Sequence, residues 1–313
     1  MNRRRDQYIQ IARRYYIDEK SQQQIAKEFS LSRPTVSNIL KKCKEMGIVE
    51  IRIQDGSPMT TAIGEQLKKA YGLKDVIVIP SEDDETSLLS RIGAAAANLT
   101  DSMLKDGIQI GIAWGTTLYQ MVHQMRPHQL SQAGIIQLMG GLGATNPQYD
   151  GSELARDLSK TLHADYYPIQ CPVVVKNSII KDLLVHEPSI EKTLSKTKSI
   201  DIAFVGLSSN APESSALVRS GFLSYEEAEK IQKAGAIGHI CGYSYDEAGN
   251  YMDISINRRI IGIAFDDLLK IPERVGIACG IDKVEAIRAS LKGNHLTTLI
   301  TDERVATELV STL

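Results

Sequence analysis

Short apolar runs alternate with amphipathic segments from about residue 62 to residue 313, and this alternation limits the fold more than any other feature of the chain. Strand-like runs separated by helical patterns predict an α/β domain, a sheet with helices packed on it. The strand-like runs are DVIVIP (75–80), IQIGIAW (108–114), GIIQLMGG (134–141), DYYPIQCPVVV (165–175), IDIAFVGL (200–207), AIGHICG (236–242), RVGIACG (274–280) and TTLIT (297–301).

The first fifty residues have a different pattern, which predicts a bundle of short helices. Apolar side chains recur at helical spacing over residues 5–17 and indicate the first helix. Ser21 and Gln24 have the spacing of a capping box that begins a second helix, and Ser32 begins a third that ends at Gly47. Because only residues 30–32 separate the second and third helices, the chain must turn sharply, which predicts a helix-turn-helix.

The outer side of the expected third helix carries side chains that can contact DNA. Arg33, Ser37 and Asn38 are candidate base readers, since Arg and Asn can bond guanine and adenine edges in bidentate fashion. Thr35 and Lys41 are candidate contacts to the phosphate backbone. A purely structural module with a polar outer face is the alternative interpretation. The full candidate set is Ser21, Gln22, Arg33, Pro34, Thr35, Ser37, Asn38 and Lys41.

Charge is divided unevenly along the chain. Residues 1–50 hold 11 Lys and Arg against 6 Asp and Glu, a net +5, although the whole chain carries −2. A basic segment suits attraction to phosphate, but a solvated charged helix fits the count almost as well. The alternation over residues 48–53 predicts a wing strand, and residues 54–61 are expected to form a linker. We therefore expect a DNA-binding domain at 1–56 and a separate α/β domain at 57–313.

Several classes of protein are disfavoured by composition. Apolar runs are too short to cross a bilayer, and MNRRRDQYIQ lacks the apolar core of a secretory signal, so we expect a cytoplasmic protein without membrane contact. The four cysteines lie far apart in apolar segments and are expected to be buried thiols. Neither they nor the six histidines have metal-ligand spacing, so we expect no metal and no other cofactor.

Three glycine-containing loops follow strand-like runs, and ligands of such sheets bind beyond the carboxyl ends of strands. After residues 108–114, Gly115 precedes Thr116 and Thr117 at an expected helix start, where free N–H groups and hydroxyls could hold an anion. In a second loop Gly280 precedes a helix start at which Lys283 could supply positive charge. A glycine after a strand often marks only a turn. The third loop supplies Gly140, Gly141 and Gly143.

The chain resembles the SorC-type sugar-responsive regulators of bacteria in three segments, SQQQIAKEFSLSRPTVSNIL, WGTT and GIDKVEAIRASLKG. The resemblance extends over the whole chain and is greatest to the deoxyribonucleoside regulator branch of that family. The resemblance implies a winged helix-turn-helix followed by an α/β domain related to sugar-phosphate isomerases. It also implies a tetramer that binds operator DNA and a phosphorylated sugar that alters DNA affinity. The phosphate site is implied at Gly115, Thr116, Thr117 and Lys283.

Three positions depart from that pattern. Met139 stands where the deoxyribonucleoside branch carries a lysine that can form an imine with an aldehyde sugar. His239 and Arg258 stand where the family commonly has acidic residues. Arg258 could bind a second phosphate of a bisphosphate or form a surface salt bridge, and His239 could contact sugar hydroxyls or be structural. These residues, with Gly140 and Gly141, complete the candidate effector site.

We expect a transcription regulator, a repressor by analogy, of a carbohydrate or nucleoside operon. One helix-turn-helix reads half a site, so a homo-oligomer, dimer or tetramer, is expected. An isomerase-like enzyme fused to a DNA-binding head is the alternative. A constitutive architectural protein is a third possibility, but it would not need a large α/β domain. The acids Asp201, Glu213, Asp253 and Asp282 lie in no catalytic motif, so no enzymatic activity is expected.

Overall fold

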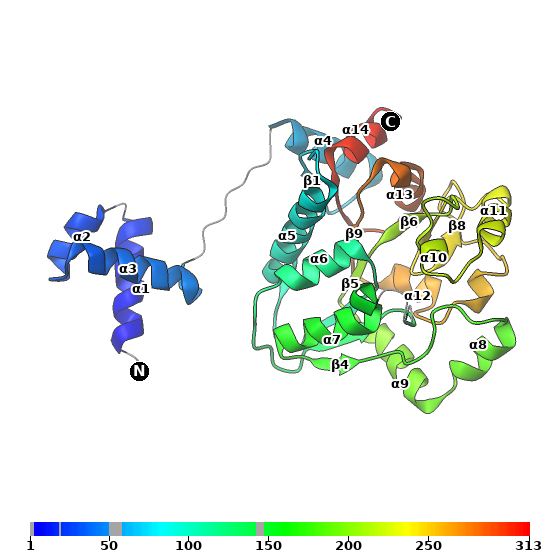
Figure 1. Cartoon of the computed structure of the whole chain (residues 1–313), viewed down its shortest axis with the longest axis horizontal. Helices are drawn as coiled ribbons and strands as arrows, with labels where there is room; N and C mark the ends of the chain where they lie inside the picture. The colour runs from blue at the N-terminus through cyan, green and yellow to red at the C-terminus, as the bar shows by residue number, and fades with distance from the viewer. Residues whose placement is uncertain (1–2, 19, 50–57, 142–146) are drawn as a thin grey trace. The chain divides into compact units, whose positions relative to one another are not determined.

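The computed structural model describes residues 3–18, 20–49, 58–141 and 147–313. The chain divides into two compact units, Met1–Asp55 and Gly56–Leu313 (Figure 1). The first is helical, and the second is built on a parallel sheet.

Three helices make up the described part of the small unit: α1 (Arg3–Tyr16), α2 (Gln22–Glu28) and α3 (Arg33–Glu45). Their apolar faces meet in one core, where Ile11, Ile25 and Val36 are fully buried. Ser21 and Gln24 form the predicted capping box of α2, and Ser32 caps α3 through the Thr35 amide. The three predicted helices and the sharp turn between the last two are confirmed, because local capping and apolar spacing suffice to specify them.

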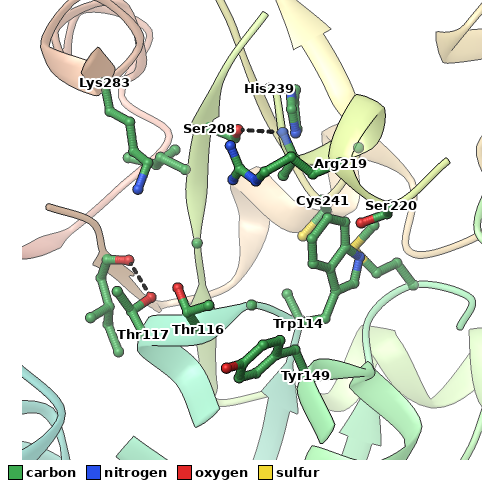
Figure 2. A pocket seen from close by; sticks show the side chains of 18 residues that line it. Trp114, Thr116, Thr117, Tyr149, Ser208, Arg219, Ser220, His239, Cys241 and Lys283 are labelled. Atoms are coloured by element: carbon green, nitrogen blue, oxygen red, sulfur yellow. Dashed lines mark hydrogen bonds between the residues drawn. The ribbon is translucent and has the colours of Figure 1, made fainter. Parts of the chain in front are cut away.

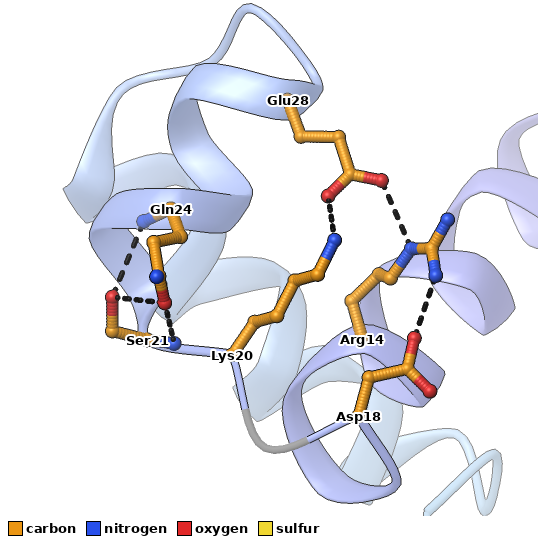
Figure 3. A network of polar contacts seen from close by, with 6 residues as sticks. All are labelled: Arg14, Asp18, Lys20, Ser21, Gln24 and Glu28. Carbon is orange, nitrogen blue, oxygen red and sulfur yellow. Dashed lines mark hydrogen bonds and ion pairs between the residues drawn. The ribbon is translucent and has the colours of Figure 1, made fainter.

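A polar network joins the ends of α1 and α2 (Figure 3). The Glu28 carboxylate accepts from Arg14 Nε at 2.9 Å and from Lys20 Nζ at 2.7 Å. Arg14 also pairs with Asp18 at 2.6 Å. Exposed ion pairs stabilise a protein little, so we assign the network the role of orienting α2 rather than holding the core together.

The large unit contains a seven-stranded parallel sheet with the order β1-β10-β9-β5-β2-β3-β4. From β2 the chain continues outward through β3 and β4, and from β5 it continues outward in the opposite direction through β9 and β10, with β1 at the far edge beside β10. The β2–β5 pair is therefore the topological switch point. The central strands are buried along their length, as expected of a sheet covered on both faces. Their bounds are β1 (Asp75–Ile79), β2 (Gln109–Ile112), β3 (Gly134–Gln137), β4 (Asp165–Tyr167), β5 (Ile202–Val205), β9 (Glu273–Ile277) and β10 (Thr298–Asp302).

A second sheet is small and antiparallel, with β7 between its neighbours: β6 (Leu207–Ser209), β7 (Gly238–Ile240) and β8 (Tyr243–Tyr245). The helices of the unit are α4 (Pro58–Tyr71), α5 (Glu85–Met103), α6 (Thr116–Gln124), α7 (Gly151–Leu162), α8 (Ser178–Leu184), α9 (Pro188–Lys196), α10 (Ala216–Arg219), α11 (Tyr225–Lys233), α12 (Phe265–Lys270), α13 (Val284–Lys292) and α14 (Glu303–Val310). Short 3-10 turns are η2 (Pro147–Tyr149), η3 (Thr197–Ser199), η4 (Asn257–Arg259) and η5 (Ile281–Lys283).

Some boundaries differ from the sequence prediction. Residues 58–61 belong to α4 instead of a linker, because Thr60, Ile63 and Leu67 form one buried helical face. The predicted strand at 165–175 ends at residue 167, since the following prolines have no N–H for a sheet ladder. Of the predicted wing strand, residues 50–53 lie outside the described residues; 48 and 49 form no strand and pack on the small core.

The packing of α5 on α6 gives a testable prediction, because Gly93 of α5 lies against α6. The two helices run side by side (Figure 1). An added Cβ at Gly93 would lie 2.5 Å from Gln120 Cβ and 2.7 Å from the Gln120 carbonyl carbon. Gly93→Ala should therefore destabilise the unit by about 1–3 kcal/mol, the usual cost of overpacking. Gly151→Ala is the control, since its nearest contact would be 3.5 Å. Thermal unfolding in which both variants melt alike would contradict this account.

Candidate functional site

A cavity of about 310 Å³ lies at the carboxyl ends of β2, β5 and β9, at the switch point of the sheet. The segment that follows each strand contributes to the cavity wall: residues 113–117 after β2, residues 206–208, which lead into β6, after β5, and Lys283 after β9. This volume falls in the range of about 300–1,000 Å³ found for small-molecule sites. The cavity can therefore hold a ligand of the size of a sugar phosphate.

The N-terminus of α6 forms one wall of the cavity (Figure 2). Gly115 is its N-cap residue with φ 131°, a conformation that a side chain would strain, and no side chain caps the helix. The first N–H groups of α6 can therefore bond a ligand, and the helix dipole favours a negative one.

The two threonines of this turn differ in environment. Thr116 is exposed at the cavity, whereas Thr117 is 6% exposed. The Thr117 hydroxyl donates to the Ile277 carbonyl at 2.9 Å. This hydrogen bond links α6 to β9 and uses the Thr117 hydroxyl proton. Of the two hydroxyls expected to donate to an anion, only that of Thr116 is therefore free to do so.

Lys283 stands above Thr116 and Thr117 on the same side of the cavity (Figure 2). The half-buried ammonium donates to the Cys279 carbonyl at 2.9 Å, so two of its N–H groups remain for other acceptors. The structure thus brings together the four residues of the implied phosphate site, Gly115, Thr116, Thr117 and Lys283.

His239 lies on β7 at the opposite side of the cavity and is 3% exposed. Its Nδ1 is 2.9 Å from Asn210 Oδ1, and Asn210 Nδ2 donates to the Gly238 carbonyl at 3.0 Å. Because the Asn210 amide nitrogen donates to that carbonyl, the amide oxygen faces the histidine and can only accept. His239 Nδ1 is therefore the donor, and Nε2 of the neutral ring is left as an acceptor. Burial, with a smaller effect of the Arg219 charge, lowers the pKa of His239 to about 3, so the ring is neutral at pH 7.

The other candidate effector residues separate into two groups. Met139 lines the cavity and is 2% exposed. Gly140 donates its amide to the Ile261 carbonyl, Gly141 lines a separate hollow, and neither reaches the cavity.

Arg258 is on the surface, where Nε and Nη2 bond both oxygens of Asp253 at 2.7 and 2.6 Å. Of the two roles considered for Arg258, a phosphate contact and a surface salt bridge, the structure shows the salt bridge. Gly143 lies outside the described residues.

The candidate DNA contacts of α3 face away from the small unit's core, while Ser21 and Gln22 lie at the start of α2. Val36, Ile39 and Leu40 of α3 point inward, and the candidate residues of α3 are exposed. Thr35 bonds Ser32 through its hydroxyl at 2.7 Å, and the Ser21 hydroxyl takes part in the α2 cap, so both side chains also stabilise helix starts. The exposed candidates of α3 are Arg33, Pro34, Thr35, Ser37, Asn38 and Lys41.

Sequence reasoning missed part of the cavity wall. Arg219 and Ser220 enter from α10 and the turn after it, a segment with no motif. Ser208 lies in β6, three residues after the end of β5, and a search just beyond the carboxyl ends of the strands could have found it. The thiols are unpaired; Cys43, Cys241 and Cys279 are buried, but Cys171 is only half-buried, contrary to expectation. Within the described part of the chain, no group of three potential metal ligands occurs and no helix could cross a bilayer.

A helix-turn-helix unit in one chain with a sugar-sized cavity defines a ligand-responsive DNA-binding regulator. Residues 58–311 match the family described as "Putative sugar-binding domain", and residues 19–50 match the winged helix-turn-helix DNA-binding family. The chain belongs to the SorC family of sugar-binding transcription regulators.

Similar proteins support this membership over the full length. The deoxyribonucleoside regulator of Bacillus subtilis (strain 168) is 33% identical, with 100% of both chains covered. The sorbitol operon regulator of Klebsiella pneumoniae is 29% identical, with 95% of each chain covered. The crystal structure of the full-length sorbitol operon regulator SorC from Klebsiella pneumoniae matches with a TM-score of 0.81 at 27% identity, over 97% of each chain. These relatives are regulators and not enzymes, which confirms the expected class.

The Thr117–Ile277 hydrogen bond predicts different roles for adjacent threonines. Thr117→Val should lower the free energy of unfolding by about 0.5–1.5 kcal/mol, because it removes a bond between α6 and a strand carbonyl. Thr116→Val, on the exposed neighbour, should change stability by less than about 0.5 kcal/mol. Denaturant unfolding of the two variants tests this. Equal stabilities would show that the bond contributes nothing.

Proposed function

We propose that this protein is a repressor whose operator affinity is controlled by a phosphorylated sugar bound in the switch-point cavity. The observation that carries the proposal is the anion-suited wall formed by Gly115, Thr116 and Lys283. Among the described residues that line the cavity none is acidic, so a negative ligand meets no like charge. Charge-assisted bonds to N–H and ammonium groups are roughly twice as strong as neutral ones.

The sugar portion extends from this wall toward His239 and Met139. His239 Nε2 accepts a hydrogen bond from a sugar hydroxyl, since the neutral ring has its proton on Nδ1. Met139 has no amine and packs against the ligand by its thioether chain. We infer that the effector is held without a covalent imine at this position.

Binding to DNA is proposed for α3, with its N-terminal residues in the major groove. One α3 reads one half-site, so the active form is a symmetric homo-oligomer, a dimer or a tetramer. The effector binds one subunit arrangement better than another and shifts the population away from the operator-bound state. The names of the relatives suggest a sugar or nucleoside operon as the target. Binding to that operon would place the protein in the cytoplasm.

A sugar phosphate should raise the melting temperature of the protein, because a ligand of the native state stabilises it, by about 2.7 kcal/mol at 100 times Kd. Lys283→Ala should abolish most of the shift by removing the cation beside the phosphate. Lys233→Ala, an exposed lysine of α11, is the control. A panel that includes deoxyribose 5-phosphate is measured by differential scanning fluorimetry. A panel without any shift in the wild type would overturn the phosphate-site proposal and leave DNA binding intact.

Asn38→Ala should weaken operator binding by about 1–3 kcal/mol, the value of one base contact, and relax the sequence preference at one position. Lys41→Ala should weaken binding to all sequences alike and reduce the salt dependence. Gln10→Ala, exposed on α1, should leave affinity unchanged. Fluorescence anisotropy with operator and scrambled DNA separates these outcomes. Equal loss on both DNAs with Asn38→Ala would refute the base-reading role.

A further inference from the structure

The cavity contains a second cation that the phosphate proposed above does not use. Arg219, the last residue of α10, lines the cavity from the side opposite Lys283 (Figure 2). Its Nη1 donates to the Ser214 carbonyl at 2.7 Å. It forms no ion pair with the acidic side chains that the structure describes. The remaining N–H groups of the guanidinium are available to a ligand.

The neighbour of Arg219 cannot neutralise it. His239 lies beside Arg219 on β7 (Figure 2). Its Nδ1 is directed at Asn210 Oδ1, 2.9 Å away. Burial keeps the pKa of His239 near 3, so the ring is neutral and adds no second positive charge beside the guanidinium. An imidazole also has no carboxylate with which the guanidinium could form an ion pair. A carboxylate at this place would pair with Arg219 and occupy it. The neutral imidazole leaves the guanidinium charge to the ligand.

Other donors are found on the same side. Ser220 follows Arg219 and lines the cavity. The Trp114 indole N–H is buried and has no hydrogen-bond partner among the described residues, although buried donors are normally paired. This side of the cavity therefore offers a guanidinium and neutral donors with no acid among its described lining residues.

We propose that the Arg219 side binds a second anionic group, so that the effector is a sugar with two acidic groups, either a sugar bisphosphate or a phosphorylated sugar acid. A guanidinium bonds phosphate or carboxylate oxygens in a two-pronged fashion, which suits both forms. The inference rests on the proposed function, since the first phosphate occupies the α6 wall. The neutral His239 then contacts the hydroxyls between the two acidic groups.

The test compares matched ligand pairs on the full chain by isothermal titration calorimetry: fructose 1,6-bisphosphate against fructose 6-phosphate, and 6-phosphogluconate against glucose 6-phosphate. One ligand with two acidic groups should bind about 10-fold or more tightly than its partner, the equivalent of one charge-assisted contact. Arg219→Gln should remove that preference while monophosphate affinity stays the same. Arg258→Gln is the matched control, since Arg258 is an exposed arginine outside the cavity.

A second variant keeps the test decisive if Arg219→Gln lowers stability. His239→Asp places a carboxylate beside Arg219 and should also abolish the preference for the second acidic group. Melting temperatures without ligand show whether each variant is folded. Equal binding of the matched ligands would overturn the inference, and so would equal loss of both ligands in Arg219→Gln, which would place Arg219 on the same phosphate as Lys283. If no sugar phosphate binds the wild type, the proposed function fails as well.

Discussion

The parallel pairing of β2 with β5 is the constraint on which the rest of the large unit depends. After β2 the chain crosses to one side of the sheet, and after β5 it crosses to the other side. The loops that follow the two strands therefore diverge, and a crevice remains between these loops. Side chains cannot fill this crevice from either strand, because it lies beyond their ends. The cavity is thus a product of topology, and the residues around it decide only which ligand it takes.

The position of α6 at the cavity depends on close packing behind the helix. Gly93 lets α5 approach α6, and the Thr117 hydroxyl bonds the last carbonyl of β9. The first contact fixes the body of α6 at Gln120, and the second fixes its first turn at the edge of the cavity. Small residues and internal hydrogen bonds therefore serve the site without touching a ligand.

The three helices of the small unit could be predicted from the sequence, whereas residues 48 and 49 of its predicted wing form no strand and the cavity could be predicted only in part. The capping box at Ser21 and the short turn before Ser32 are local signals, and the structure contains both. The glycine loop at Gly115 was recognisable because a strand, a glycine and a helix start follow one another. Arg258 was misleading, since its partner Asp253 is five residues away and nothing in the sequence favours pairing over binding. Arg219 carried no signal at all.

Apolar periodicity, helix caps and glycine turns act over a few residues, so the helix-turn-helix, the α/β class and the loops after the strands are encoded locally. That Lys283, His239 and Arg219 share one cavity, while Gly140 and Arg258 do not, became apparent only in the folded chain. Those residues meet across β9, β7 and α10, which lie far apart in the chain, and their proximity follows from strand order. Strand order is set by long-range packing, and no local pattern encodes it.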